Sequence, residues 1–293
     1  MDAGEEPRIQ LAYGIEMDLA HICNLHCRYC SHYSNYGLKG VVSISDGICW
    51  LGALAKRVVP KTFYLQGGEP MLNPNLCEFI WAVREFWPET KLGVVSNGLL
   101  LDRQPDLWTT LAQTGAILEI SRHSHTDEVY LKRFEPAVAA ARVAAQHHGV
   151  QLIVREGYST FYATYRGEGP TMRPFNLGQP KESWTNCCNR YCMNLHQGKL
   201  WKCPPIAFLK LVTAKFGLDT LPDWQPYLSY RGLDVEASRH DYAVFLTKNA
   251  GPEAICNMCP TTLDDLHYHT DVTTMPKFPS PLIGTDNTNG FND

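Results

Sequence analysis

Cysteines are the residues of this sequence best suited to chemistry, because most of them stand in groups. The 293-residue chain contains 11 cysteines, an odd number that does not suit a fully paired disulfide framework. In a reducing compartment, clustered thiols usually bind metal. We therefore expect metal centres built from three groups, and two isolated cysteines that are small core residues of helices. The groups are Cys23, Cys27 and Cys30; Cys187, Cys188, Cys192 and Cys203; and Cys256 and Cys259, while Cys49 and Cys77 stand alone.

The first group has the spacing Cys-x3-Cys-x2-Cys and directly follows an apolar, strand-like run. Three such thiolates can bind three irons of a [4Fe-4S] cluster and leave the fourth iron open to a non-protein ligand. The alternative is a structural zinc site, in which a nearby histidine supplies the fourth ligand. The candidates for that ligand are His21, His26 and His32.

Alternating strand and helix patterns before residue 156 predict βα units and a parallel sheet. With at least four or five such units, we expect an α/β fold with an open, partly closed barrel. The first cysteine group follows a strand, and it would lie at the barrel face that carries active sites. The expected strands cover 13–19, 62–66, 91–96, 116–121 and 150–155.

Helices are expected between these strands. Asn73 and Pro74 are typical of the N-cap and first residue of a helix. The alanine-rich segment 126–147 predicts a second helix, and Ser43 or Ser45 would cap a third.

A further chemical signal, QGGEP, follows the second expected strand. Together with the cysteine triad, it resembles the radical S-adenosylmethionine (SAM) enzymes over roughly residues 13–160. The resemblance implies a partial (β/α)6 barrel, a [4Fe-4S] cluster on the triad, and SAM at its open iron. In this family the GGEP loop meets the amino group of SAM. Glycines permit close approach of backbone carbonyls, and a glutamate offers a carboxylate to an ammonium group. The loop residues are Gly67, Gly68, Glu69 and Pro70.

Other contacts to SAM are implied at the strand ends. Ser96 and Asn97 match the family's ribose contact, and Ser121 ends the next strand. Arg155 would pair with the SAM carboxylate, and Tyr29 would pack near adenine. The alternatives are helix capping by the serines, a surface ion pair for the arginine, and ordinary packing for the tyrosine.

Glycine and proline become frequent after the fifth expected strand, which indicates a linker or a substrate-facing loop. In the run CMNLHQGKLWKCPP, Gly198 predicts the turn of a hairpin that brings Cys192 close to Cys203. A helix near 235–248 follows. We therefore expect a barrel over 1–160, a linker over 161–186, a small hairpin-and-helix domain over 187–275 and a tail over 276–293.

The later cysteines resemble the auxiliary-cluster region called twitch, a shortened form of the SPASM domain. This resemblance implies a second [4Fe-4S] cluster in a small β-hairpin plus helix domain. A structural zinc ribbon on the same residues is the alternative. A thiol left unbound beside the substrate could donate a hydrogen atom to a carbon radical. The implied ligands are Cys203, Cys256 and Cys259, with one of Cys187, Cys188 and Cys192.

The resemblance implies that SAM is cleaved to methionine and a 5'-deoxyadenosyl radical, which abstracts hydrogen from a substrate. The arrangement of motifs is similar to radical SAM epimerases and dehydrogenases that act on aminoglycosides and sugars. Surplus thiols favour epimerisation, and dehydrogenation of a carbinol with the auxiliary cluster as electron acceptor is an alternative. Maturation of ribosomal peptides and a noncatalytic zinc-binding protein are further alternatives.

The composition of the chain limits the kinds of partner that it is expected to bind. With 26 Lys+Arg against 30 Asp+Glu, the chain has no basic excess for binding nucleic acid. It has no apolar run of about 18 residues for crossing a membrane. Its acidic N-terminus lacks a secretory signal, so we expect a cytoplasmic protein. The expected partners are a carbohydrate substrate and an electron donor such as flavodoxin or ferredoxin.

Overall fold

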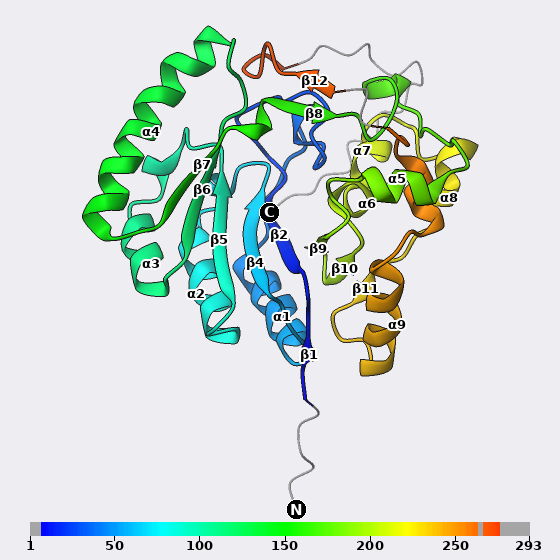
Figure 1. Ribbon diagram of the computed structural model, residues 1–293, viewed down its shortest axis with the longest axis horizontal. Coiled ribbons are helices and arrows are strands. Elements are labelled where there is room, and N and C mark those ends of the chain that lie inside the picture. Colours follow the sequence, from blue (N-terminus) through cyan, green and yellow to red (C-terminus); the bar gives the residue numbers. More distant parts are fainter. Residues whose placement is uncertain (1–6, 263–265, 276–293) are drawn as a thin grey trace, which may run out of the picture.

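The computed structural model describes residues 7–262 and 266–275 of the chain. Its centre is a sheet with the strand order β11-β10-β9-β2-β4-β5-β6-β7 (Figure 1). All neighbours from β9 to β7 run parallel, as the βα pattern predicted. At one edge, β10 pairs antiparallel with both β9 and β11. The chain therefore has the expected α/β fold with a partial barrel.

The parallel strands are mostly buried apolar runs, as expected for sheets whose faces are both covered. Five of them lie within two residues of the expected ranges, and β6 is buried at every position. The sixth, β9, comes from the second half of the chain. The bounds are β2 (Gly14–Ala20), β4 (Thr62–Gly67), β5 (Lys91–Ser96), β6 (Ile117–Ser121), β7 (Leu152–Arg155) and β9 (Cys192–His196).

A helix follows each of β2, β4, β5 and β6, and these helices lie side by side along one face of the sheet (Figure 1). The first is capped by Ser43, whose hydroxyl accepts from the Asp46 backbone N–H at 3.1 Å, which decides between the two expected caps. The long fourth helix ends at Gly149, in the left-handed conformation with φ 68°. The helices are α1 (Ile44–Ala55), α2 (Leu76–Phe86), α3 (Leu107–Thr114) and α4 (Glu128–His148).

The predicted start of α2 was wrong. The helix begins at Leu76 after Asn75, two residues later than the expected cap. The side-chain amide of Asn73 instead donates to the carbonyls of Leu19, at 2.9 Å, and Val42, at 3.0 Å. It therefore links the end of β2 to the segment before α1. An N-cap side chain bonds to its own helix and would not make this link.

The predicted hairpin is confirmed and forms part of the main sheet. Its turn is Gln197–Gly198, where both residues have positive φ, 49° and 66°, as a two-residue hairpin turn requires. Strand β9 then pairs parallel with β2, with Glu16 opposite Asn194. The predicted helix near 235–248 begins later, at Arg239, because Ser238 forms a capping box with Asp241 at its start.

Shorter elements complete the described chain. Strand β8 pairs antiparallel with β12, so the segment that follows β7 meets the C-terminal part of the described residues. The expected tail over 276–293 lies outside the described residues, and the division into domains stays a prediction. The strands are β1 (Ile9–Gln10), β3 (Val58–Val59), β8 (Thr160–Tyr162), β10 (Lys199–Trp201), β11 (Leu233–Asp234) and β12 (Leu266–Tyr268). The helices are α5 (Pro180–Asn186), α6 (Pro204–Ala207), α7 (Leu209–Lys215), α8 (Gln225–Leu228) and α9 (Arg239–Asn249).

Two apolar cores support these elements. The larger lies between the parallel strands and their helices and includes Phe63, Phe79 and Phe134. The smaller packs tyrosines of the cysteine loop, such as Tyr33, against the second half of the chain at Phe208. None of the helices in the described part of the chain has the length and apolar composition that a bilayer crossing requires.

Candidate active site

A cavity of about 480 Å³ lies at the carboxyl ends of β2, β4, β5 and β6. It is lined by the first cysteine group, by both glycines of QGGEP and by polar residues that end two strands. This is the face at which α/β barrels carry active sites. The predicted residues that line the cavity are Cys23, Cys27, Tyr29, Cys30, Gly67, Gly68, Ser96, Asn97 and Ser121.

The three cysteines of the first group share one wall of this cavity. The Leu25 backbone N–H donates to the Cys23 sulfur at 3.4 Å. Burial raises the pKa of the Cys27 thiol, and the charges of Cys23 and Cys30 add to the effect. Burial also acts to raise the pKa of Cys30, but a hydrogen bond and the charge of His32 outweigh it and lower this pKa. Three cysteines in the wall of one cavity are a donor set of the kind that binds three irons of a cluster.

The histidines that could complete a zinc site differ from the expected ones. Cys27, His123 and His269 offer ligand atoms that all lie within 4.8 Å of one another. Burial lowers the pKa of His123 to about 3, so its ring is neutral at pH 7. His32 instead lies 3.6 Å from the carboxylate of Asp18. A zinc site of this kind would use one of the three cysteines and leave the other two without a role.

The glycines of the QGGEP loop are required by close backbone packing. Gly67 has φ 143°, and a Cβ there would lie 2.5 Å from the carbonyl oxygen of Ala20. A Cβ on Gly68 would lie 2.3 Å from the carbonyl oxygen of Ile22. The Gly68 N–H donates to Ala20 at 2.6 Å, so the loop lies directly against the segment that leads into the cysteines.

The Glu69 side chain does not line the cavity, contrary to its predicted contact with an ammonium group. It is fully buried, and its carboxylate accepts from the Ser96 hydroxyl at 2.7 Å and from the backbone N–H of Asn97 at 2.9 Å and Met71 at 3.1 Å. Burial raises its pKa to about 7. The carboxylate therefore fixes the glycine loop to the end of β5. The adjoining Pro70 is buried and begins a short 3-10 helix.

The polar residues at the strand ends have structural partners as well as a place in the cavity wall. The Ser96 hydroxyl accepts from the Gly98 N–H at 3.0 Å within the turn after β5, and the next helical segment has Leu100 as its N-cap. The Asn97 amide donates to Asn24 at 2.7 Å, which ties β5 to the cysteine loop. Ser121 is buried and also lines the cavity. Their ribose contact stays a prediction.

Arg155 adopts the expected alternative, an ion pair. Its guanidinium contacts the buried carboxylate of Glu119, which also accepts from the Tyr64 hydroxyl at 3.1 Å. The Arg155 side chain is 43% exposed, and it is not among the residues that line the cavity. A contact with the SAM carboxylate would require it to leave this pair.

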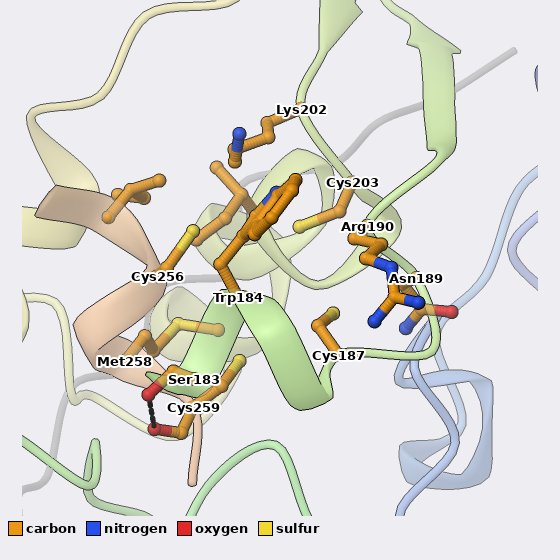
Figure 2. A pocket seen from close by; sticks show the side chains of 12 residues that line it. Ser183, Trp184, Cys187, Asn189, Arg190, Lys202, Cys203, Cys256, Met258 and Cys259 are labelled. Carbon is orange, nitrogen blue, oxygen red and sulfur yellow. Dashed lines mark hydrogen bonds between the residues drawn. The ribbon is translucent and has the colours of Figure 1, made fainter. Parts of the chain in front are cut away.

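The later cysteines divide between two cavities. One set lines a small cavity of about 30 Å³, together with Trp184 (Figure 2). Cys188 and Cys192, expected among the candidate ligands of the auxiliary cluster, line the large cavity instead. The set at the small cavity is Cys187, Cys203, Cys256 and Cys259.

Backbone direction explains this division. Cys187 is extended at the end of α5, with φ −71° and ψ 124°, and successive side chains of an extended chain point to opposite sides. Cys187 and Cys188 therefore face different cavities. Cys192 begins β9 and lines the large cavity, whereas Cys203 lies beyond β10, where the chain turns into α6, and lines the small one. The expected closeness of these two cysteines stays a prediction.

Burial raises the pKa of the thiols of Cys203, Cys256 and Cys259, and the charge of Cys187 adds to each of these shifts. Four cysteines around one small cavity are a donor set that fits either an iron-sulfur cluster or zinc. The isolated cysteines lie elsewhere. The predicted burial of Cys49 was wrong, because it is exposed on α1, and Cys77 is half-buried on α2.

Sequence reasoning missed several polar residues of the large cavity. Acidic residues in a buried strand are unusual, so the alternation of Glu16 with Asp18 in β2 was a usable signal. Ser34 and Asn35 follow the cysteine loop, and in each of them one buried side-chain oxygen has no hydrogen-bond partner among the described residues. Such atoms favour a polar ligand, because buried polar groups are normally paired.

Part of the chain matches known proteins. Residues 17–151 match the family model described as Radical SAM superfamily. The chain is similar to GTP 3',8-cyclase of Cronobacter sakazakii (strain ATCC BAA-894), with 30% identity over 112 residues, which are 37% of this chain and 34% of the relative. It is also similar to GTP 3',8-cyclase of Trichodesmium erythraeum (strain IMS101), with 34% identity over 96 residues, 30% of this chain and 28% of the relative. The chain thus spans about a third of the length of these curated relatives.

Similar solved structures have low sequence identity. One is BtrN in complex with AdoMet and 2-DOIA, with 14% identity, a TM-score of 0.49, and coverage of 92% of this chain and 98% of that chain. Another is native anSMEcpe with bound AdoMet, with 18% identity, a TM-score of 0.38, and coverage of 48% of this chain and 42% of that chain.

Proposed function

We propose that the chain is a radical SAM enzyme that epimerises a carbon of an aminoglycoside or sugar, and the match of residues 17–151 to the Radical SAM superfamily model supports the first part of this proposal. The observation that carries this proposal is the large cavity, which joins the first cysteine group to two further thiols, Cys188 and Cys192. A hydrogen-abstracting cofactor and a hydrogen-donating thiol would then face the same substrate.

The first cysteine group would hold a [4Fe-4S] cluster through Cys23, Cys27 and Cys30. When bound and reduced, this cluster with SAM supplies a 5'-deoxyadenosyl radical. The residues of the protein would bind SAM and orient it for reaction. Gly67 and Gly68 leave room for the methionine part of SAM, and buried side chains around the cavity exclude water. An iron-sulfur protein or a flavoprotein, such as ferredoxin or flavodoxin, would supply the electron.

Epimerisation requires a hydrogen atom delivered to the substrate radical from the other face. A thiol can do this by breaking its S–H bond and forming a C–H bond, which leaves a sulfur radical. The large cavity offers two thiols, and its unpartnered oxygens on Ser34 and Asn35 would accept hydrogen bonds from the hydroxyl or amino groups of a carbohydrate.

The four cysteines around the small cavity would hold a second [4Fe-4S] cluster, with Cys187 as the ligand that the sequence left undecided. Zinc is the alternative for the same thiols. Metal analysis of anaerobically reconstituted protein separates these two outcomes.

Dehydrogenation is the second candidate, and one contact favours it. The hydroxyl of Tyr162, a residue of the large cavity, lies 3.5 Å from the Cys187 sulfur of the small one. A substrate radical that lost an electron toward the second cluster, and a proton to solvent, would become a ketone.

Anaerobic turnover in D2O tests both candidates. Reconstituted protein would receive SAM, reductant and a panel of aminoglycosides and amino sugars, with mass spectrometry of the products. We expect 5'-deoxyadenosine and a sugar one mass unit heavier, because the exchangeable thiol hydrogen is transferred. A sugar two units lighter would mean dehydrogenation. GTP, named by the curated relatives, belongs in the panel, and a change in GTP alone would contradict the carbohydrate assignment.

A further inference from the structure

Cys192 and Glu16 lie on neighbouring parallel strands with their side chains toward the same cavity. In the register of β9 with β2, Cys192 is opposite Gly14 and Asn194 is opposite Glu16. Side chains two residues apart on a strand share a face. Both Cys192 and Glu16 line the large cavity, and the two side chains are close enough for each to affect the pKa of the other.

Cys188 has a different setting. It is exposed and lies in the loop between α5 and β9, where its sulfur donates weakly to the side-chain oxygen of Asn189 at 3.7 Å. Tyr162 and Cys187 are its nearer influences, and the charge of Glu16 acts on it least. Side chains on strands are held more rigidly than side chains on loops. Cys192 is therefore the better-positioned donor.

Polar side chains from neighbouring segments contact the Glu16 carboxyl directly or through one another. The Gln66 amide donates to Glu16 at 2.9 Å and lies 3.4 Å from the His32 ring. His32 in turn lies 3.6 Å from Asp18, which accepts from Asn194 at 3.1 Å. This chain of contacts fixes the carboxyl in place beside the thiol.

Burial raises the pKa of Glu16, so its carboxyl holds a proton at higher pH than an ordinary glutamate does. Burial also raises the pKa of the Cys192 thiol, and the charge of Glu16 adds to that shift. Both effects favour the S–H form of the cysteine, and only this form can donate a hydrogen atom.

Resting on the proposed epimerisation, we propose that Cys192 is the hydrogen donor and that Glu16 returns a proton to its sulfur after each turnover. The S–H bond breaks as the new C–H bond forms, which leaves a sulfur radical. One electron, from a low-potential iron-sulfur or flavin donor, and one proton, from the Glu16 carboxyl, then restore the S–H bond. Glu16 afterwards regains a proton from solvent at the cavity.

Four variants and one control test this assignment under the D2O conditions described above. Cys192→Ala should form 5'-deoxyadenosine without a deuterated sugar, whereas Cys188→Ala should still incorporate deuterium. Glu16→Gln should complete a first turnover and then slow by about 100-fold, the lower end of what a general acid contributes. Glu16→Asp should recover part of the later turnovers. Cys77→Ala, on α2 away from the cavity, is the matched control.

A second readout needs no substrate. In Glu16→Gln, Cys192 should react faster with iodoacetamide at a pH where Glu16 is ionised, because the neighbouring negative charge is gone. Cys188, on which that charge acts more weakly, should change less. Iron content and SAM binding of each variant report correct folding, and Cys192→Ser replaces any alanine variant that fails this check.

Deuterated product from Cys192→Ala or Cys192→Ser would overturn the donor assignment. Undiminished later turnovers in Glu16→Gln, or an unchanged alkylation rate of Cys192, would overturn the role of Glu16. Failure of the proposed epimerisation is distinguishable from both, because the unsubstituted protein would then give no deuterated sugar at all.

Discussion

The hydroxyl of Tyr162 lies 3.5 Å from the sulfur of Cys187, although the two side chains line different cavities. Tyr162 ends β8, the strand that pairs with β12, so its backbone is held in a two-stranded sheet. One side chain therefore connects the proposed substrate cavity with the four cysteines of the proposed auxiliary site. An electron that passes between the two sites, or a displacement at one site that affects the other, has a short route through Tyr162.

Removing the Tyr162 hydroxyl should break the contact between the two cavities without removing metal from either site. We expect Tyr162→Phe to keep its iron content and to form 5'-deoxyadenosine, but to form less sugar product for each 5'-deoxyadenosine. The ring still fills its place, while the contact with Cys187 is lost. Quantifying both products in one anaerobic reaction checks this, and an unchanged ratio would show that the contact has no role in turnover.

Alanine substitution of two adjacent cysteines, Cys187 and Cys188, should affect the iron content of the protein differently. Cys187→Ala should lose about half of the cluster iron, because a [4Fe-4S] site needs its fourth thiolate. Cys188→Ala should keep all of it, because its side chain faces the large cavity. Iron and acid-labile sulfide analysis measures the difference. If Cys187→Ala lost zinc and no iron, the site would be a zinc site.

The glycine loop should not accept a side chain. In Gly68→Ala the new methyl group would meet the carbonyl oxygen of Ile22 at 2.3 Å, so backbone must move. We expect a loss of about 1–3 kcal/mol in the free energy of unfolding, with weaker SAM binding, because the displaced loop is part of the cavity wall. Gly251→Ala, which meets nothing within 4 Å, is the matched control for thermal unfolding and for SAM titration. Equal behaviour of the two variants would contradict this account.

A buried ammonium group holds the last cysteines in place. Lys202 is buried, donates to the carbonyl oxygens of Asn249 at 3.2 Å and Gly251 at 2.9 Å, and pairs with Glu253 at 2.9 Å. Lys202→Met should lower the free energy of unfolding by about 3 kcal/mol, because Glu253 then keeps a poorly solvated, unpaired charge.

The exposed ion pair of Lys199 with Asp234 supplies the comparison for that variant. Lys199→Met should change the free energy of unfolding by less than about 1 kcal/mol, since solvent screens both charges. Urea unfolding of both variants decides the point. Similar losses in the two proteins would show that Lys202 is no more important than a surface lysine.

The parallel strands were predictable because each is a short apolar run followed by a helical pattern. Helix α3 was missed because two of its four buried positions are threonines, Thr110 and Thr114, which hide the apolar period. The structure satisfies Thr114 internally, since its hydroxyl donates to the Thr110 carbonyl at 2.7 Å. Such back-bonding is invisible in the sequence.

In the candidate site, residues close in sequence were predictable and partners across the fold were not. The spacing of the first cysteine group placed three thiols in one loop. The choice between Cys187 and Cys188 depends on the backbone angles at the end of α5, which adjacent identical residues cannot reveal. The contact of Glu16 with Cys192 depends on the pairing of β2 with β9, strands separated by most of the chain.

The pairing of β2 with β9 affects any fragment made from the first half of the protein. A fragment that stops after residue 160 would contain the matched family region and lack β9, so the backbone groups along one side of β2 would lose their partners. An uncovered strand edge of this kind recruits strands from other chains. The isolated first half is therefore expected to aggregate, and the hairpin that carries Cys192 also acts as the cover that keeps the barrel soluble.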